Sequence, residues 1–78
     1  MNYARLTELG NKIRHNTASK AEKDEYMLIL YQNGDITEKQ YNDYISGRNT
    51  ESLVNVGLAA GAILLAGYLL SQLFSKKD

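Results

Sequence analysis

The side chains that most often carry catalysis or bind metals are scarce in this chain of 78 residues, which has one histidine and no cysteine. A zinc site needs several ligands in a set geometry, so His15 alone predicts none. Asp24 and Glu25 are adjacent and therefore diverge on a helix, which favours solvent-facing charge over a catalytic pair. Phosphate-binding loops, nucleophile elbows and HExxH motifs are also missing from the sequence. We therefore expect no enzyme, no metal ion and no cofactor.

Small residues at helical spacing near the C-terminus form the pattern with the clearest physical meaning. Gly57 and Gly61 make a GxxxG sequence. In lipid there is little hydrophobic drive between helices, so small residues promote packing by letting backbones approach closely. We predict a helix-packing interface that supports self-association or pairing with a partner span. The predicted interface consists of Gly57, Ala60, Gly61, Leu64, Gly67, Tyr68 and Ser71.

The segment around this interface has the properties of a membrane-spanning helix. No charged residue occurs from Ser52 to Ser75, and a helix over residues 53–74 would reach roughly 33 Å, enough for a hydrocarbon core of about 30 Å. In the charged tail, residues 75–78, Lys76 and Lys77 are predicted to anchor that end at the lipid headgroups. The alternative is a core helix, but no other part of the chain has enough apolar surface to bury it on all sides.

Residues 1–50 are predicted to form a polar head of three short helices, at about 3–14, 20–32 and 38–46. Ser19 with Glu22, and Thr37 with Gln40, have the spacing of capping boxes that open the second and third helices. Gly34 suits the left-handed position just beyond a helix end. The predicted fold class is therefore all-α, with a three-helix head that includes an αα-hairpin and one C-terminal transmembrane helix.

The head also contains candidate surfaces for a partner. Its charge is uneven, because basic residues outnumber acids up to Lys23, whereas the segment from Asp24 to Asp43 is acidic. The basic residues of the first helix suit either a solvated face or contact with an anionic membrane surface. The second helix contains six consecutive large apolar residues, YMLILY, which need cover from another element, subunit or membrane. The partner-docking candidates are Tyr26, Met27, Leu30, Tyr31, Tyr41, Tyr44 and Ile45.

Residues 24–47, DEYMLILYQNGDITEKQYNDYISG, resemble the short helical hairpin family called SHOCT. The resemblance rests on an amphipathic helix, a glycine-containing turn, an ITExxY start and a second short helix. It covers about a third of the chain. In that family the hairpin usually lies at a C-terminus, whereas here an apolar helix follows it. The resemblance implies a protein-interaction or oligomerisation element, often in bacterial membrane-associated proteins, and no catalytic residues.

Together these features predict a small single-pass membrane protein of bacterial or phage type, tail-anchored with its head in the cytoplasm. Its expected partners are the lipid bilayer, further copies of itself and another membrane or cytoplasmic protein. One alternative is a membrane-active protein, either a holin-like lysis factor or a pore-forming toxin. Another is a soluble assembly subunit that buries the apolar helix between copies. Nucleic acid is not an expected partner, because the net formal charge is zero.

Overall fold

The computed structural model describes residues 2–75, which form four α-helices and no strand. They are α1 (Tyr3–Arg14), α2 (Lys20–Gln32), α3 (Glu38–Ile45) and α4 (Thr50–Ser75). The first two match the predicted bounds, α3 ends one residue earlier than predicted, and α4 begins three residues before Leu53. The all-α prediction is confirmed, with a C-terminal helix long and apolar enough to span a membrane.

Local hydrogen bonds start the head helices where the sequence predicts. Ser19 and Glu22 form a complete capping box at α2, and Thr37 with Gln40 forms another at α3. Each box satisfies two backbone N–H groups that a helix start leaves without a partner. At α1, the Asn2 side chain accepts a hydrogen bond from the Arg5 N–H.

Each head helix ends in a Schellman motif, in which two N–H groups beyond the helix bond back to its last turn. After α2, the Gly34 N–H donates to the Tyr31 carbonyl and the Asp35 N–H to the Leu30 carbonyl. Gly34 has a φ of +76°, which glycine adopts without steric cost. Comparable pairs of bonds close α1 around Asn16 and α3 around Gly47. These stops keep the three head helices short and fold them back on one another.

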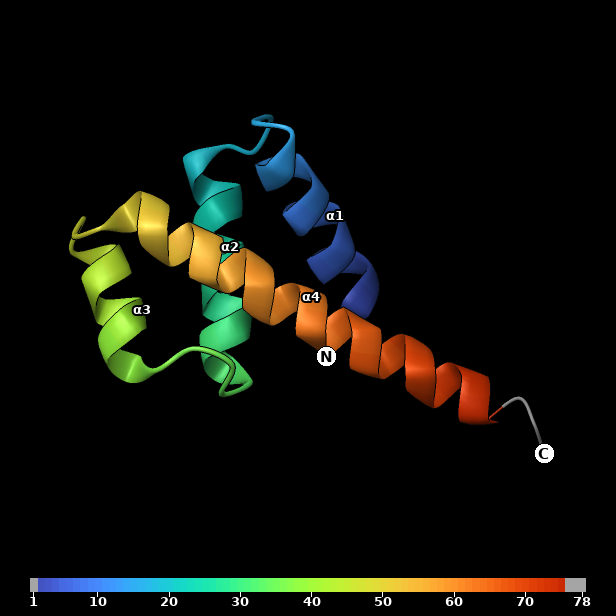
Figure 1. The fold of residues 1–78 in the computed structure, drawn as a ribbon. Coiled ribbons are helices and arrows are strands. Elements are labelled where there is room, and N and C mark those ends of the chain that lie inside the picture. The colour runs from blue at the N-terminus through green and yellow to red at the C-terminus, as the bar shows by residue number, and fades with distance from the viewer. Residues whose placement is uncertain (1, 76–78) are drawn as a thin grey trace.

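The core lies where α1, α2 and α3 surround the first part of α4 (Figure 1). Five of its side chains are almost completely buried: Leu6, Leu9, Tyr26, Met27 and Leu30. Val54 of α4 belongs to the same core, so α4 is part of the folded head and not only an appendage to it.

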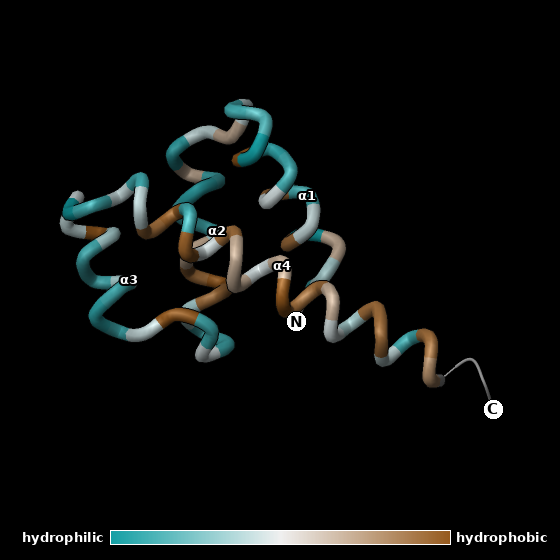
Figure 2. The backbone as a smooth tube through the Cα atoms, viewed as in Figure 1, coloured by the Kyte–Doolittle hydropathy of each residue, from teal (hydrophilic) through white to brown (hydrophobic). Residues whose placement is uncertain are grey.

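The remainder of α4 extends beyond the other helices (Figure 1). The radius of gyration is 13.2 Å, larger than the roughly 11.5 Å typical of a compact domain of this length. Figure 2 shows that this extension carries mostly apolar residues. One end of the molecule is thus an apolar rod without cover from the described residues.

Candidate membrane-interaction site

The helix α4 has an inner face that packs on the head and an outer face that does not. Val54, Gly57 and Gly61 are buried on the inner face, and Leu58, Leu64, Leu65 and Tyr68 are partly buried. On the outer face Val56 and Ile63 are 42% and 74% exposed. All side chains from Leu69 to Phe74 are exposed. We call residues 53–68 the docked segment and residues 69–74 the projecting segment.

The glycines of the GxxxG sequence receive side chains from α2. The Tyr26 hydroxyl donates a buried hydrogen bond of 3.1 Å to the Gly57 carbonyl. A Cβ atom at position 57 would lie 2.8 Å from the Met27 Sδ, and one at position 61 would overlap the Tyr26 hydroxyl. A side chain at either position would therefore displace Tyr26 or Met27 from its contact with α4. Burial of the Tyr26 ring also raises the pKa of its hydroxyl, which keeps it a hydrogen-bond donor.

An aromatic pair marks the far end of the docked segment. The rings of Tyr3 and Tyr68 stack with their centroids 4.1 Å apart and an angle of 17° between their planes. Beyond this pair α4 has no further contact with the hydrophobic core cluster. The projecting segment presents Leu69, Leu70, Leu73 and Phe74, each 55–70% exposed. Apolar side chains clustered in this way are typical of surfaces that bind a membrane or another protein.

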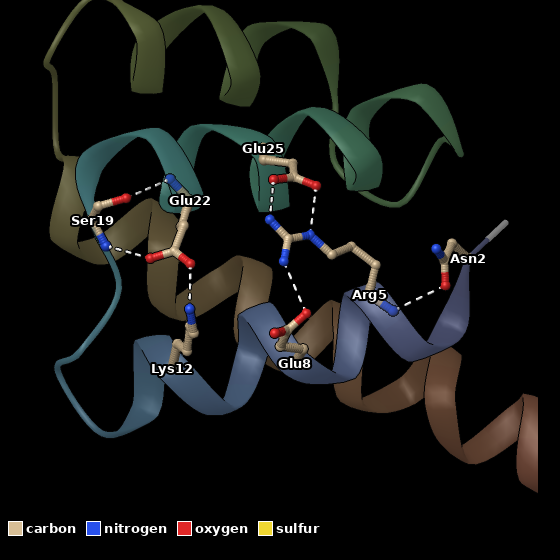
Figure 3. A network of polar contacts seen from close by, with 7 residues as sticks. All are labelled: Asn2, Arg5, Glu8, Lys12, Ser19, Glu22 and Glu25. Carbon is tan, nitrogen blue, oxygen red and sulfur yellow. Dashed lines mark hydrogen bonds and ion pairs between the residues drawn. The ribbon is translucent and has the colours of Figure 1, made fainter.

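Ion pairs between α1 and α2 hold the platform on which α4 rests (Figure 3). The Arg5 guanidinium donates to both carboxylate oxygens of Glu25 at 2.7 and 2.8 Å, and also binds Glu8. The Lys12 ammonium donates to Glu22 at 2.6 Å. Lys12 and the capping N–H of Ser19 lower the pKa of Glu22 to about 2. Basic side chains of α1 thus pair with acidic side chains of α2.

A second polar link joins α2 to α3. The Tyr44 hydroxyl donates to the Asp24 carboxylate at 2.7 Å, and Lys20 binds its other oxygen at 2.9 Å. Both contacts lower the pKa of Asp24, that from Tyr44 more strongly. Asp24 and Glu25 were predicted to be solvent-facing charges, but each instead links α2 to a neighbouring helix. Adjacent residues on α2 diverge as expected, and their divergence lets them reach α3 and α1 respectively.

The partner-docking candidates divide into two sets in the folded head. Tyr26, Met27, Leu30 and Tyr44 are core residues, no more than 7% exposed, so they are not available to a partner in this arrangement. Tyr26, Met27 and Leu30 are covered by α4, because their side chains lie against Gly57 or Gly61 of that helix. Tyr31 and Tyr41 are partly exposed and stack on each other with centroids 4.7 Å apart.

The seventh candidate, Ile45, is 55% exposed and lines an open groove between the ends of the four helices. Ile13 and Val54 contribute to the apolar lining of this groove. Arg14 and Lys23 also line it, and neither forms an ion pair with an acid among the described residues. The acids Asp24 and Glu51 line the groove as well, so its lining mixes apolar and charged side chains. Of the accessible docking candidates Ile45 lies in this groove, whereas Tyr31 and Tyr41 lie outside its lining.

The predicted helix-packing interface is likewise divided. Gly57 and Gly61 are buried, Ala60, Leu64 and Tyr68 are partly buried, and Gly67 and Ser71 are exposed. A Cβ atom at Gly67 would have no neighbour within 4 Å. The head therefore occupies the first part of this interface, and self-association through the interface stays a prediction. Lys76 and Lys77, the predicted headgroup anchor, lie outside the described residues.

The lone histidine is placed at the end of α1, away from other candidate ligands. His15 is exposed, and its Nδ1 lies 2.7 Å from the Asn11 carbonyl oxygen. Among residues 2–75 no three histidine or acidic side chains lie close enough to hold a metal ion.

No family model, no curated protein and no solved structure matches this chain. The resemblance of residues 24–47 to SHOCT accordingly rests on those residues alone. Within residues 2–75, α4 is the one helix long and apolar enough to cross a membrane, and 11% of its most apolar stretch is buried. Most of that stretch thus remains free to contact lipid or another protein.

Proposed function

We propose that this protein is a small membrane-anchored interaction protein, with α4 as the membrane anchor and the helical head as the docking module. The observation that carries this proposal is the uncovered apolar surface of α4, which extends from Val56 on the outer face to Phe74. Burying apolar surface is worth roughly 25 cal/mol per Å², so large side chains on the projecting segment favour transfer into lipid. No charged side chain from residue 52 to residue 75 opposes that transfer.

The part of the head available to a partner is the groove beside Ile45 and the stacked Tyr31 and Tyr41. Aromatic and aliphatic groups supply contact area. In the groove the basic residues Arg14, Lys20 and Lys23 outnumber the acids Asp24 and Glu51, which favours acidic groups on the partner. The proposed partner is therefore a segment with apolar and acidic side chains, from a membrane or cytoplasmic protein. Self-association of α4 is a further part of this proposal. In the docked arrangement it would use Gly67 and Ser71, the exposed part of the predicted interface.

Vesicle flotation tests the anchor. The full chain is mixed with phosphatidylcholine and phosphatidylglycerol vesicles and compared with a Leu70→Glu/Leu73→Glu variant. Both positions are exposed, so the variant should keep the fold and lose flotation, because carboxylates resist entry into hydrocarbon. The matched control, Gln32→Glu/Asn42→Glu, adds the same charge at exposed head positions and should float like the native chain.

Two other results would point to the alternative functions. Native protein that stays in the aqueous phase as a defined oligomer would contradict the anchor and favour a soluble assembly subunit. Release of a dye trapped in the vesicles would favour a membrane-active protein, either a lysis factor or a toxin. Flotation without dye release supports the anchor.

A further inference from the structure

The docked position of α4 is incompatible with a complete membrane span. The projecting segment has six residues and reaches roughly 9 Å, whereas the hydrocarbon core is about 30 Å thick. A span over residues 53–74 would bring the docked segment, and everything packed on it, into hydrocarbon. The attached α1 and α2 carry ion pairs such as Arg5 with Glu25, and charged groups are costly at that depth. In the docked position, therefore, α4 can insert only its tip or its outer face.

We infer that the head restrains membrane insertion of α4: α2 holds the inner face through Tyr26 and Met27, and α4 must leave this seat before it can span. This inference rests on the proposed function as a membrane anchor. The docked state inserts shallowly through the projecting segment, and the released state spans with its whole apolar length in lipid.

The contacts that hold α4 suit a releasable restraint. Within residues 2–75 they are apolar packing, one side-chain hydrogen bond, from Tyr26 to Gly57, and the Tyr3–Tyr68 stack. Every ion pair among the described residues lies within the head and none reaches α4. Lipid can replace the apolar packing around α4, so the specific contacts that the helix loses on insertion are few.

Release has a consequence for the head. It uncovers Tyr26, Met27 and Leu30, which are at most 1% exposed while α4 is docked. These are three of the residues that the sequence predicts as docking candidates. Their exposure to water is unfavourable, which favours the binding of a partner that covers them. The head surface that a partner can bind is therefore larger after insertion than before it, so insertion and docking should favour each other.

A removable crosslink can test the restraint, because the chain has no cysteine. Met27→Cys with Gly57→Cys puts two thiols on facing positions, because the Met27 side chain reaches to 2.8 Å from the position of a Cβ at residue 57. The shorter cysteine at position 27 also removes the sulfur atom that would obstruct a side chain at position 57. Oxidation would lock α4 to α2 and a reductant would free it. The two single cysteine variants serve as controls for the substitutions themselves.

Single tryptophans report insertion depth, because the native chain has none. Ile63→Trp puts the probe near the midpoint of residues 53–74, on the outer face at a site 74% exposed. Leu73→Trp puts it in the projecting segment. Each variant is added to two sets of phosphatidylcholine vesicles, one brominated near the headgroups and one near the acyl-chain ends. Quenching of fluorescence by the shallow and the deep bromines is measured alongside flotation.

We expect the locked protein to float, with quenching by the shallow bromines at position 73 and no quenching by the deep bromines at position 63. Reduction should then produce deep quenching and a blue shift at position 63. Deep quenching at position 63 in the locked protein would overturn the restraint and leave the anchor intact. The same holds if the protein floats but shows no deep quenching at position 63 in either the locked or the reduced form. Failure of the native chain to float would overturn the anchor itself, and the restraint with it.

A second pair of variants tests the restraint without a crosslink. Gly61→Leu overlaps the Tyr26 hydroxyl and should raise the deeply quenched fraction at position 63 above that of the native glycine. Ala66→Leu, at an exposed position of the same helix outside the predicted packing interface, should leave that fraction unchanged. Equal deep quenching for the two leucine variants would contradict a role for the α2 seat.

Discussion

The two segments of α4 share an uncharged, apolar character but have opposite surroundings. The docked segment, residues 53–68, and the projecting segment, residues 69–74, are both uncharged and rich in apolar side chains. The first has a buried or partly buried residue in every turn, and the second has none. The difference comes from glycine, since Gly57 and Gly61 admit Tyr26 and Met27 of α2. Apolarity therefore indicates that a helix needs cover, whereas the shape of its surface decides what covers it.

The largest expected difference comes from truncating one leucine of α2 that packs on the docked segment and one leucine of the projecting segment. Leu30→Ala takes away a completely buried side chain that lies against Gly57, and should lower the free energy of unfolding by about 2–5 kcal/mol. Leu73→Ala, at a site 62% exposed, should change it by less than about 0.5 kcal/mol. Chemical denaturation followed by circular dichroism measures both. Similar losses would show that the projecting segment is packed as tightly as the docked one.

Enlarging a glycine in each segment probes the same contrast through steric overlap. Gly61→Leu should destabilise the folded head by about 1–3 kcal/mol because it drives α4 away from Tyr26. Gly67→Leu should be nearly neutral. Thermal unfolding of the two variants in the absence of lipid provides the comparison. If Gly61→Leu melts like the native chain, the inner face of α4 does not seat on α2.

The single hydrogen bond to the docked segment should make a smaller contribution. Tyr26→Phe removes the donor to the Gly57 carbonyl and should cost about 1 kcal/mol. Tyr68→Phe keeps the ring that stacks on Tyr3 and should cost close to nothing. The midpoints of chemical denaturation, compared at the same dependence of the free energy of unfolding on denaturant concentration, give the stability difference between the two variants. A loss confined to Tyr68→Phe would mean that the far end of the docked segment is the main attachment.

The smallest effect is expected from pH, because acid acts on the head and α4 has no charged side chain between residues 52 and 75. The folded head lowers the pKa of Glu22 from 4.5 to about 2 and also lowers those of Asp24 and Glu25. Groups with a lowered pKa stabilise the fold above their unfolded values. Stability should therefore decline as the pH falls from about 4.5 towards 2.

Melting temperatures between pH 7 and pH 2 can show this decline. Glu22→Gln should flatten it and lower stability at pH 7, because it removes the partner of Lys12. The effect is modest since exposed ion pairs contribute little. A decline that begins above pH 6 would contradict the assignment to these carboxylates.

The local structure of the head was predictable from short sequence signals. Ser19 with Glu22 and Thr37 with Gln40 place two helix starts, and Gly34 and Gly47 place two ends, because caps depend on residues only a few positions apart. The unequal charge of the two ends of the head was also visible. Which charged residues pair with one another could not be predicted from the sequence. Arg5 and Glu25, for example, are 20 residues apart and meet only because α1 and α2 pack side by side.

The sequence by itself determined the four helices and the uncharged apolar character of α4, because both depend on neighbouring residues and composition. It also identified the small residues of that helix, but not their partner. Only the tertiary structure decided that Gly57 and Gly61 face Tyr26 and Met27 of the same chain and that Gly67 remains open. The physical reason is that close packing depends on the shapes of two surfaces at once, and a periodic pattern in one helix describes only its own.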